Sequence, residues 1–470
     1  MGRMSVRGSL RCRGWRVALR VVVFGTLVAG ALDAGIAVAG MSGAVMEATA
    51  AVPHGLVVGR PFALLGGGLE KVALGADGMA WVAVASDEEE SESFAVDGRA
   101  ASGHGIRPVN VANAALPSVA VSGSTAMFVW YTVPVGELRP GHPQPQMLDA
   151  MRCTSSGCGP VRTLARWEEV DVPPLQDNFS VGYPAQPAVV GVDGQFVVLF
   201  EPESAQEMMD WVQSDGSTFG SVHSFGMAGE PYPVAAAQSD GSVIAAWPGP
   251  FKSPGIEWSR WSAGAGFSTP QRLGGTTDYA ADLVAAGDGS GVALAWLQGS
   301  NCGGAPGLLT CPVWAALPGA GGGLGPASRV DSPAAGQLSL AGGDGVFALA
   351  FARATISGYA DDAQGTYLER SINGQPFNRP VDLDADTGSS PAVTFDGHGD
   401  ALVVWRHEPP PPNSGNSTVR LALIARTGDA FTPITLGGDA YDDSPLIAST
   451  PNQTLITWQS PGGTGVLATP

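Results

Sequence analysis

Seven acidic or tyrosine residues stand in short polar segments and are the first candidates for chemistry. They are Asp278, Tyr279, Asp282, Asp386, Tyr441, Asp442 and Asp443. A tyrosine beside an aspartate can bind a sugar, because the ring stacks on a sugar face and the carboxylate accepts hydrogen bonds from hydroxyls. Grouped aspartates also offer the oxygen ligands that Ca²⁺ prefers, and no other cofactor is expected. The plainer interpretation, which comes first for any single residue, is that each carboxylate binds N–H groups of its own turn.

Common catalytic signatures are absent from the sequence. It has no G-x-S-x-G nucleophile turn, no H-E-x-x-H zinc site and no phosphate-binding loop. The histidines are scattered without metal-ligand spacing: His54, His104, His142, His223, His398 and His407. A carboxylate pair for glycosidic cleavage could form between distant segments, but a single sequence does not reveal it. The catalytic residues are therefore unassigned, and binding is favoured over catalysis.

Four cysteines follow residues 1–39, which are interpreted below as a secretory leader. They are Cys153, Cys158, Cys302 and Cys311. An even number of cysteines in an exported chain is typical of disulfides. Their short separations predict one bridge within the first pair and one within the second. Zinc is a weaker interpretation, because a tight zinc cluster needs closer cysteine pairs with histidines nearby.

The scaffold that must hold these residues is a repeat. The stretch AVTFDGHGDALVVW at 392–405 has seven counterparts along the chain, each with two apolar runs around a short turn. The repeats end at Val84, Trp130, Phe200, Trp247, Trp296, Phe351, Trp405 and Trp458. A nearly constant period of this size is typical of repeat architectures. The recurring tryptophans are expected to be packing residues.

Each repeat predicts a four-stranded antiparallel sheet. Asp-Gly turns, with Ser122-Gly123 and Pro451-Asn452 as variants, join the first two strands. A looser third strand follows, and then a fourth with an aromatic residue, a proline and a leucine, as in FNRPVDL at 377–383. Proline cannot donate to a ladder, so the fourth strand is expected at the edge. Such a unit is a blade of a β-propeller.

The two ends of the chain predict how the ring closes. The last repeat stops after its third strand, GVLATP at 465–470. The segment GRPFALLGG at 59–67 has the proline–leucine spacing of a fourth strand. We therefore expect an all-β, single-ring propeller of eight blades over 56–470, with the N-terminal strand completing the last blade. Seven blades is the alternative if the first unit is irregular.

The pattern P-x-V-A-V-D-x-D-G-x-A-x-V-x-W, followed by an arginine-bearing strand, resembles secreted bacterial β-propellers related to the sialidase and BNR-repeat superfamily. The resemblance spans about residues 56–470. The segment SDGSTF at 214–219 is similar to the sialidase Asp-box, which is a structural turn in that family. The resemblance implies an arginine triad near the inner strands for true sialidases. The expected inner strands here contain no arginine, so sialidase activity is not expected.

Loop lengths predict which face of the ring is functional. The turns between first and second strands are short, whereas loops such as 132–146 and 406–417 are long and unlike one another. Binding residues usually lie on loops held by a rigid scaffold. We therefore expect a non-enzymatic protein that binds carbohydrate or another surface ligand through the long-loop face. A glycan-active hydrolase or lyase, and a protein-interaction scaffold, are the alternatives.

The N-terminus has the layout of a secretory signal peptide over 1–39. Six arginines precede the apolar run 21–32, and Ala37-Val38-Ala39 supplies a cleavage signal. Residues 40–55 are expected to be a linker. Asp33 and the shortness of the run argue against a spanning helix, so no membrane span is expected after cleavage. The protein is expected outside the cell or in the periplasm.

The chain is strongly acidic. Its net charge is −19, and removing the six arginines and one aspartate of the leader makes it −24 (−19 − 6 + 1). Such a chain repels phosphate backbones, which disfavours nucleic acid as a partner, and none is expected. We interpret the charge as a source of solubility and expect a monomer.

Overall fold

The structure of the protein is a computed structural model, and its described residues all belong to the unit Gly43–Pro470. The described residues are 57–58, 62–63, 69–85, 93–100, 105–132, 144–169, 186–202, 208–215, 218–227, 232–250, 253–299, 311–334, 337–354, 363–385, 388–408, 417–426, 428–438, 444–458 and 464–469. The leader and linker, 1–55, lie outside these ranges, so the signal peptide and the secreted location stay predictions.

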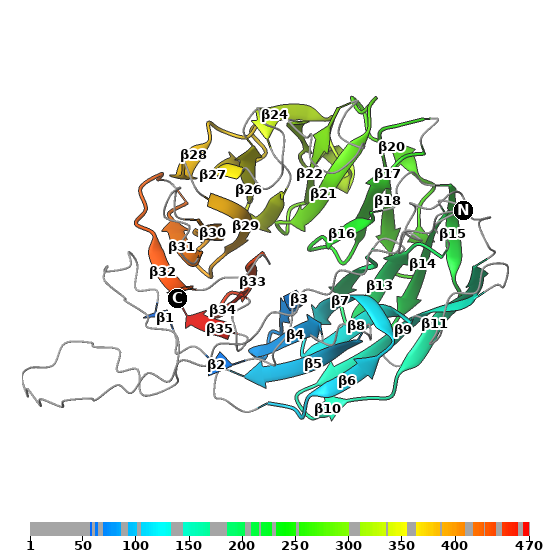
Figure 1. Cartoon of the computed structure of the whole chain (residues 1–470). Helices are drawn as coiled ribbons and strands as arrows, with labels where there is room; N and C mark the ends of the chain where they lie inside the picture. Colours follow the sequence, from blue (N-terminus) through cyan, green and yellow to red (C-terminus); the bar gives the residue numbers. More distant parts are fainter. Residues whose placement is uncertain are drawn as a thin grey trace, which may run out of the picture. The chain divides into compact units, whose positions relative to one another are not determined.

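The described residues form eight antiparallel sheets, one for each repeat (Figure 1). Strands are given from the innermost outward. Sheet 1 consists of β3 (Leu69–Leu74), β4 (Met79–Ala85), β5 (Ser93–Ala100) and β6 (Val109–Ala112). Sheet 2 consists of β7 (Ala114–Ser122), β8 (Thr125–Thr132) and β9 (Gln144–Thr154), with β10 (Gly157–Cys158) and β11 (Arg162–Glu169) both paired to β9. Sheet 3 consists of β12 (Ala188–Val192), β13 (Gln195–Phe200), β14 (Met208–Ser214) and β15 (His223–Met227). Sheet 4 consists of β16 (Val234–Ala237), β17 (Val243–Pro248) and β18 (Ile256–Ser262), with β19 (Gly266–Phe267) and β20 (Gln271–Arg272) both paired to β18.

Sheets 5 to 8 follow the same order. Sheet 5 consists of β21 (Ala280–Gly287), β22 (Val292–Gln298), β23 (Cys311–Ala316) and β24 (Ser328–Ala334). Sheet 6 consists of β25 (Ser339–Gly343), β26 (Val346–Ala354), β27 (Ala363–Ile372) and β28 (Val381–Asp384). Sheet 7 consists of β29 (Gly388–Phe395), β30 (Ala401–His407), β31 (Thr418–Ile424) and β32 (Ile434–Gly438). Sheet 8 consists of β33 (Leu446–Thr450), β34 (Gln453–Trp458) and β35 (Thr464–Thr469), with β1 (Val57–Val58) and β2 (Phe62–Ala63) both paired to β35.

The sheets follow one another around a ring. Innermost strands of successive sheets are in contact from β3 through β33, and β33 contacts β3 again. Each pair of neighbouring sheets shares one hydrophobic cluster, including the pair formed by sheets 8 and 1. This arrangement confirms the predicted single-ring β-propeller.

Second strands lie deepest in each sheet because both of their faces are covered. Every residue of β17 and β22 is buried. The repeated tryptophans Trp130, Trp247, Trp296, Trp405 and Trp458 are at most 2 % exposed. Truncating a buried tryptophan typically costs about 3–5 kcal/mol. The prediction that these residues pack in the core is confirmed.

The closing strand also lies where the repeats predict it. Val57 and Val58 of β1 pair with Thr469 and Ala468, and Phe62 of β2 pairs with Gly465. The first and last described strands of the propeller therefore lie in sheet 8. Two short ladders on β35 hold the start of this domain to its end.

The short turns depend on aspartates and on positive backbone φ. Asp193 and Gly194, at φ 46° and 77°, form a tight turn that joins β12 to β13, and Asp344 with Gly345 repeats it. The last turn differs from its prediction, since Asn452 has no positive φ in the described backbone.

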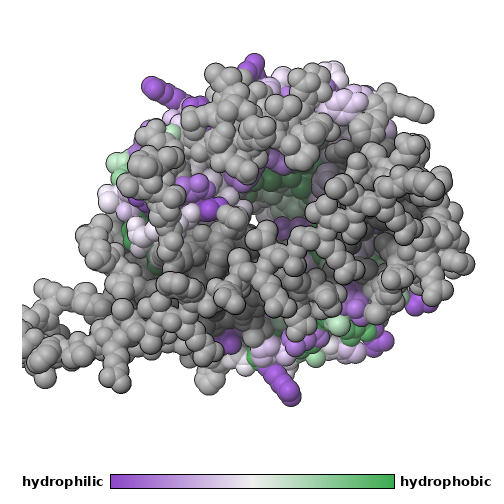
Figure 2. All heavy atoms as spheres, viewed as in Figure 1, coloured by the Kyte–Doolittle hydropathy of each residue, from purple (hydrophilic) through white to green (hydrophobic). Residues whose placement is uncertain are grey.

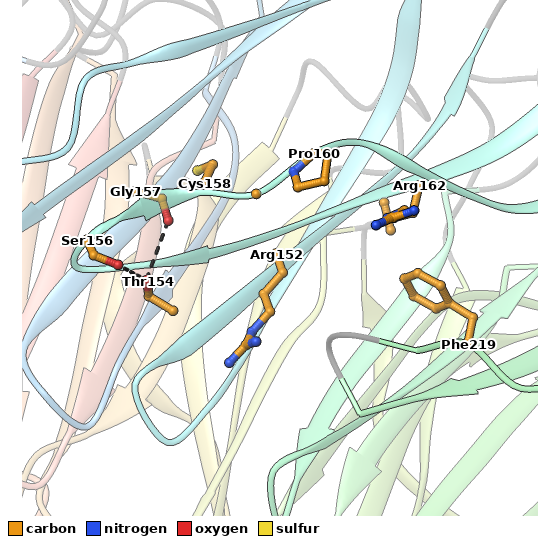
Figure 3. A pocket seen from close by; sticks show the side chains of 10 residues that line it. Arg152, Thr154, Ser156, Gly157, Cys158, Pro160, Arg162 and Phe219 are labelled. Carbon is orange, nitrogen blue, oxygen red and sulfur yellow. Dashed lines mark hydrogen bonds between the residues drawn. The ribbon is translucent and has the colours of Figure 1, made fainter.

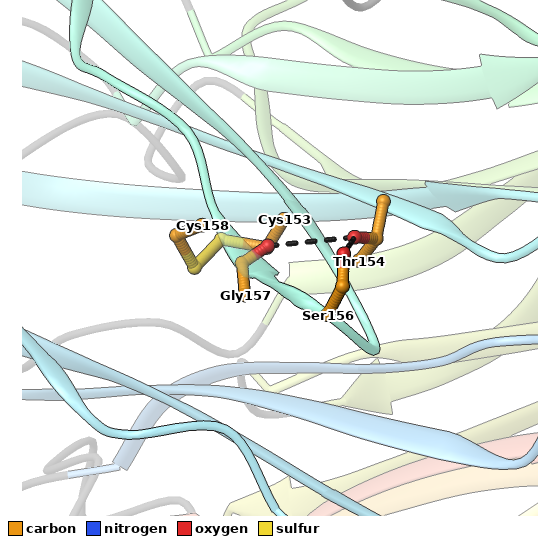
Figure 4. The surroundings of a disulfide bond; sticks show 5 residues. All are labelled: Cys153, Thr154, Ser156, Gly157 and Cys158. Carbon is orange, nitrogen blue, oxygen red and sulfur yellow. Dashed lines mark hydrogen bonds between the residues drawn. A yellow bond between two sulfur atoms is a disulfide. The ribbon is translucent and has the colours of Figure 1, made fainter.

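The outer strands confirm the edge prediction with one difference. Pro270, Pro380 and Pro433 each stand immediately before an outer strand rather than within it. The pyrrolidine ring of proline fixes the backbone angle φ, and proline has no backbone N–H. Proline therefore suits the position where the chain enters an edge strand. In sheet 2 the edge is fastened covalently, since Cys153 of β9 and Cys158 of β10 form the predicted disulfide (Figure 4). Cys311 is disulfide-bonded too, but Cys302 lies outside the described residues, so that pairing stays a prediction.

Candidate functional site

The ring has two different faces. First-to-second and third-to-fourth turns lie at one end of the strands, which we call the short-turn face. Second-to-third loops and the connections between sheets lie at the other end, the long-loop face. Figure 2 shows a hollow at the centre of the ring with hydrophobic and hydrophilic residues on its wall.

Three of the seven predicted site residues are described, and they have different roles. Asp278 accepts a hydrogen bond from the backbone N–H of Tyr279 at 2.9 Å, as the plainer interpretation expects. Asp282 instead reaches another sheet, as described below. The structure does not describe Asp386, Tyr441, Asp442 and Asp443, so their roles stay predictions.

Hydrogen bonds connect three sheets where their inner strands begin on the long-loop face. The Asp282 carboxylate accepts a hydrogen bond from the N–H of Gln337 at 3.0 Å. The Gln337 side-chain oxygen accepts one from the N–H of Ser390 at 2.8 Å. The inner strands begin around the central opening of the ring on the long-loop face, which we call the mouth. We therefore call these three residues the mouth arc. They precede the core of β21, β25 and β29 at equivalent positions, and so they bind sheets 5, 6 and 7 together.

The mouth arc has an unusual backbone. The φ angles of Asp282, Gln337 and Ser390 are 47°, 74° and 48°, and Leu116 at the same position of sheet 2 has 53°. Non-glycine residues rarely adopt this left-handed region, and each such residue costs on the order of 1–3 kcal/mol. The same conformation therefore recurs with four different side chains. A backbone outlier that recurs without a shared side chain marks a site where chemistry can vary.

A second polar cluster lies beside the arc, where sheets 6 and 7 meet. Asp384, the last residue of β28, accepts hydrogen bonds from Trp405 Nε1 at 2.9 Å and from Arg420 Nη1 at 3.5 Å. Its carboxylate also lies 2.7 Å from Nδ1 of His407. The side chains of Asp384, His407 and Arg420 are 8 %, 19 % and 29 % exposed. We call these three residues the Asp384 cluster. A histidine held by a carboxylate can transfer protons, and an arginine can bind an anion.

Sequence reasoning missed this cluster, although one signal could have found it. The residue two positions after a repeated tryptophan often satisfies the buried indole N–H. Trp296 donates to Gln298 at 2.9 Å, and Trp130 donates to Thr132 at 3.2 Å. His407 stands at this position after Trp405, but there the indole donates to Asp384 instead.

Tyr232 is another residue that the sequence analysis overlooked. It lies just before β16 on the long-loop face, and it is 55 % exposed. No other aromatic residue is among the exposed large hydrophobic residues of the described chain. Its position matches that of the arc residues in the following sheets.

Two cavities lie at the outer rim instead of the mouth. One, of about 630 Å³, lies between sheets 3 and 4 and is bordered by Trp211, His223 and Phe267. The rings of Trp211 and His223 stack at 4.6 Å, and Trp211 is 8 % exposed, so this cavity is mainly an aromatic packing region. The other lies between sheets 2 and 3, beside the predicted Asp-box. There Asp215 accepts hydrogen bonds from the N–H and hydroxyl of Thr218 at 2.6 and 2.9 Å, which makes the box a structural turn.

Neither a metal cluster nor a membrane helix occurs in the described part of the chain. No three residues among its His, Cys, Asp and Glu side chains are arranged to hold a metal ion. Calcium binding therefore stays a prediction for the loops that carry Asp386 and Asp442. Within the same ranges, no helix has the length and apolar character needed to cross a bilayer.

Comparison with known proteins places the chain among distant structural neighbours. No family model and no curated protein matches its sequence. A PL25 ulvan lyase aligns at 11 % identity over 87 % of this chain and 95 % of its own, with a TM-score of 0.44. The polysaccharide lyase Uly1 aligns at 11 % identity over 75 % and 88 %, with a TM-score of 0.42. The β-propeller domain of the Trilobed protease from Pyrococcus furiosus aligns at 8 % identity over 77 % and 94 %, with a TM-score of 0.40. Likeness at this level carries no argument about activity or site residues.

Proposed function

We propose that the protein is a secreted, non-enzymatic β-propeller that binds carbohydrate at the long-loop face. The observation that carries this proposal is the mouth arc. It presents carboxylate and amide groups from successive sheets at one place, on a backbone held in a rare conformation. Sugar hydroxyls need such fixed donors and acceptors, because a rigid site loses little entropy on binding.

The surroundings of the arc support the same ligand. Asp282 and Gln337 are exposed, so a ligand can reach them. Tyr232 adds an amphipathic ring at the matching position of sheet 4, and such rings bind sugar faces well. The resemblance of the repeats to the sialidase and BNR-repeat superfamily fits a glycan ligand and stays an expectation.

Binding to a panel of soluble polysaccharides tests the proposal. Gln337→Ala removes the acceptor for Ser390 N–H, and we expect the affinity of the mature protein for its best glycan to fall roughly tenfold. The matched control is Gln271→Ala, because Gln271 is also exposed but lies on the outer strand β20. Equal affinity of both variants, or no glycan bound at all, would contradict the proposal.

A glycan lyase is the second candidate, because the Asp384 cluster places a histidine and an arginine together. Elimination from a uronic acid removes the proton on C5, forms a C4–C5 double bond and breaks the C4–O glycosidic bond. It requires a base for that proton and a cation for the neighbouring carboxylate, and the protonated base or water can supply the proton that the departing oxygen takes up. His407 and Arg420 have these chemical properties. The test is release of unsaturated products, which absorb ultraviolet light, from acidic polysaccharides. Product release that His407→Gln abolishes would replace the non-enzymatic proposal with this one.

A further inference from the structure

Three third strands carry an arginine at the same position of the sheet. Arg152, Arg260 and Arg370 each pair with the residue three places before the closing aromatic of the second strand. Identical positions send the side chains in the same direction, toward the third-to-fourth turn of the next sheet.

In two of the three sheets that turn receives the arginine. Arg260 donates to the carbonyl of Gly321 in sheet 5 at 3.1 Å. Arg370 is only 4 % exposed and donates to the carbonyls of Ala425 at 2.6 Å and Gly428 at 2.9 Å in sheet 7. Arg260 also forms an ion pair with Asp240 of its own sheet, and Arg370 forms one with Asp429 of the next sheet. Carboxylates together with these carbonyl oxygens therefore compensate the two guanidinium charges.

Arg152 lacks this arrangement. Its hydrogen bond within the described chain goes to Thr125 Oγ1 of its own sheet, at 3.4 Å. Between Arg152 and the next sheet lies a cavity of about 470 Å³, and Phe219 of the Asp-box turn lines its far side. The Arg152 side chain is exposed. No described residue of the next sheet accepts a hydrogen bond from Arg152, whose side chain lines the cavity instead.

A second arginine lines the same cavity. Arg162 of β11 pairs with Ala150 of β9, which is two residues from Arg152 on the same face of the sheet. Side chains on this diagonal lie about 7–8 Å apart at their bases. In Figure 3 the Phe219 ring projects from the neighbouring sheet toward this pair of arginines. Among the described residues that line the cavity none is acidic, so a bound anion would relieve the repulsion between the two guanidinium groups.

The cavity is built on a fixed hairpin. The Cys153–Cys158 disulfide joins β9 to β10, and the Thr154 and Ser156 hydroxyls, 2.8 Å apart, lie at the tip. Both hydroxyls line the cavity and can bond to further oxygens of a ligand.

We propose that this cavity binds the anionic group of an acidic polysaccharide, a carboxylate or a sulfate ester carried on a sugar ring. Paired guanidinium groups match the geometry of both oxyanions. Phe219 and the two hydroxyls suit the sugar that bears the group. The site lies at the outer rim between sheets 2 and 3 and is independent of the mouth. A net charge of −19 for the whole chain disfavours nonspecific attraction of polyanions, so binding would have to be local.

The experiment compares four probes on the mature protein at low salt: dextran sulfate, polygalacturonate, neutral dextran and inorganic sulfate. We expect binding of at least one acidic polymer and none of neutral dextran. The double variant R152Q/R162Q should weaken that binding roughly tenfold or more. The control R329Q/R379Q makes the same charge change at two exposed arginines of sheets 5 and 6 and should leave the affinity unchanged.

Three outcomes would overturn the proposal. They are no binding of either acidic polymer, equal losses in the two double variants, and binding of inorganic sulfate as tight as that of the polymers. Gln337→Ala should leave polyanion binding intact, which separates failure of this site from failure of the mouth. Thermal melts of each variant check that folding is retained. The double variant C153S/C158S offers a further readout and leaves the disulfide of Cys311 intact. A loosened hairpin should lower polyanion affinity more than glycan binding at the mouth.

Discussion

The short-turn face and the long-loop face solve the same backbone problem in different ways. On the short-turn face one solution recurs: Asp77, Asp240, Asp288 and Asp396 each accept the N–H of the residue two places on, at 2.8–3.2 Å. On the long-loop face the backbone shape recurs, but leucine, aspartate, glutamine and serine occupy it.

This difference separates two requirements. A turn that must bond its own N–H groups needs a particular side chain, so aspartate repeats from sheet to sheet. A strand that begins in a left-handed conformation does not require one particular side chain. The side chains at this position can therefore differ from sheet to sheet, as Leu116, Asp282, Gln337 and Ser390 do. Substitutions should therefore affect stability most where the ring is fastened and least at the mouth.

Removing the closing strand should have the largest effect. Deletion of 56–66 removes β1 and β2 and leaves β35 with an open edge, and an open ring loses the contacts between sheets 8 and 1. We expect failure to accumulate or a large fall in Tm. Deletion of 40–52 is the control and should melt like the mature protein. If both deletions melt alike, the strand does not close the ring.

A side chain added at Gly397, where two sheets approach closely on the short-turn face, should have the second-largest effect on stability. A Cβ on Gly397 would lie 1.9 Å from the carbonyl oxygen of Pro451 in sheet 8. Gly397→Ala should therefore force the sheets apart and lower the free energy of unfolding by about 3 kcal/mol. Gly428→Ala is the matched control, because a Cβ there meets nothing within 4 Å. Denaturant unfolding of the two variants measures the difference, and equal midpoints would mean that the sheets yield easily.

A buried bond shows that the long-loop end is not uniformly tolerant. The Tyr131 hydroxyl donates to the carbonyl of Glu201 at 3.3 Å and accepts from its N–H at 3.1 Å, which ties sheets 2 and 3 together. Tyr131→Phe should cost about 1–2 kcal/mol.

The same tyrosine predicts a response to alkaline pH. Burial raises the pKa of Tyr131 above its ordinary value, although the hydrogen bond with the Glu201 backbone opposes the rise and the Glu201 charge adds a smaller increase. The phenol is neutral in both states below the unfolded pKa of about 10, and above it only the unfolded form ionises readily. Stability should therefore fall as pH rises past that value, and more steeply in the parent than in Tyr131→Phe. Parallel pH profiles of Tm for the two proteins would contradict this assignment.

The smallest effect is expected at the mouth itself. Ser390→Gly keeps the backbone N–H that bonds Gln337 and relieves the left-handed conformation of a residue with a side chain. Stability should stay equal or rise by about 0.5–1 kcal/mol, and glycan binding should be unchanged. A loss of more than about 1 kcal/mol in chemical denaturation would show that the serine side chain supports the fold.

Sequence reasoning predicted the scaffold because the scaffold repeats. Buried tryptophans, Asp-Gly turns and the prolines of several outer-strand segments recur along the chain, and the Pro-x-x-Leu spacing of GRPFALLGG identified the closing strand. The Asp384 cluster could not be predicted in this way. Its members come from three strands of two sheets, and their proximity depends on strand register and on how the sheets pack. Arg152 repeats in register, but the cavity beside it depends on how sheets 2 and 3 pack, which the repeat pattern does not reveal.

The pairing of β1 with β35 also determines when, during synthesis, the ring can close. Val57 leaves the ribosome long before its partner Thr469, so their ladder cannot form until all the strands between them have been made. Until then the two strands nearest the N-terminus have no sheet to join, and the ring stays open. Loops closed over such distances form slowly. A chain interrupted late in synthesis would contain seven of its eight sheets in full and still lack a closed ring.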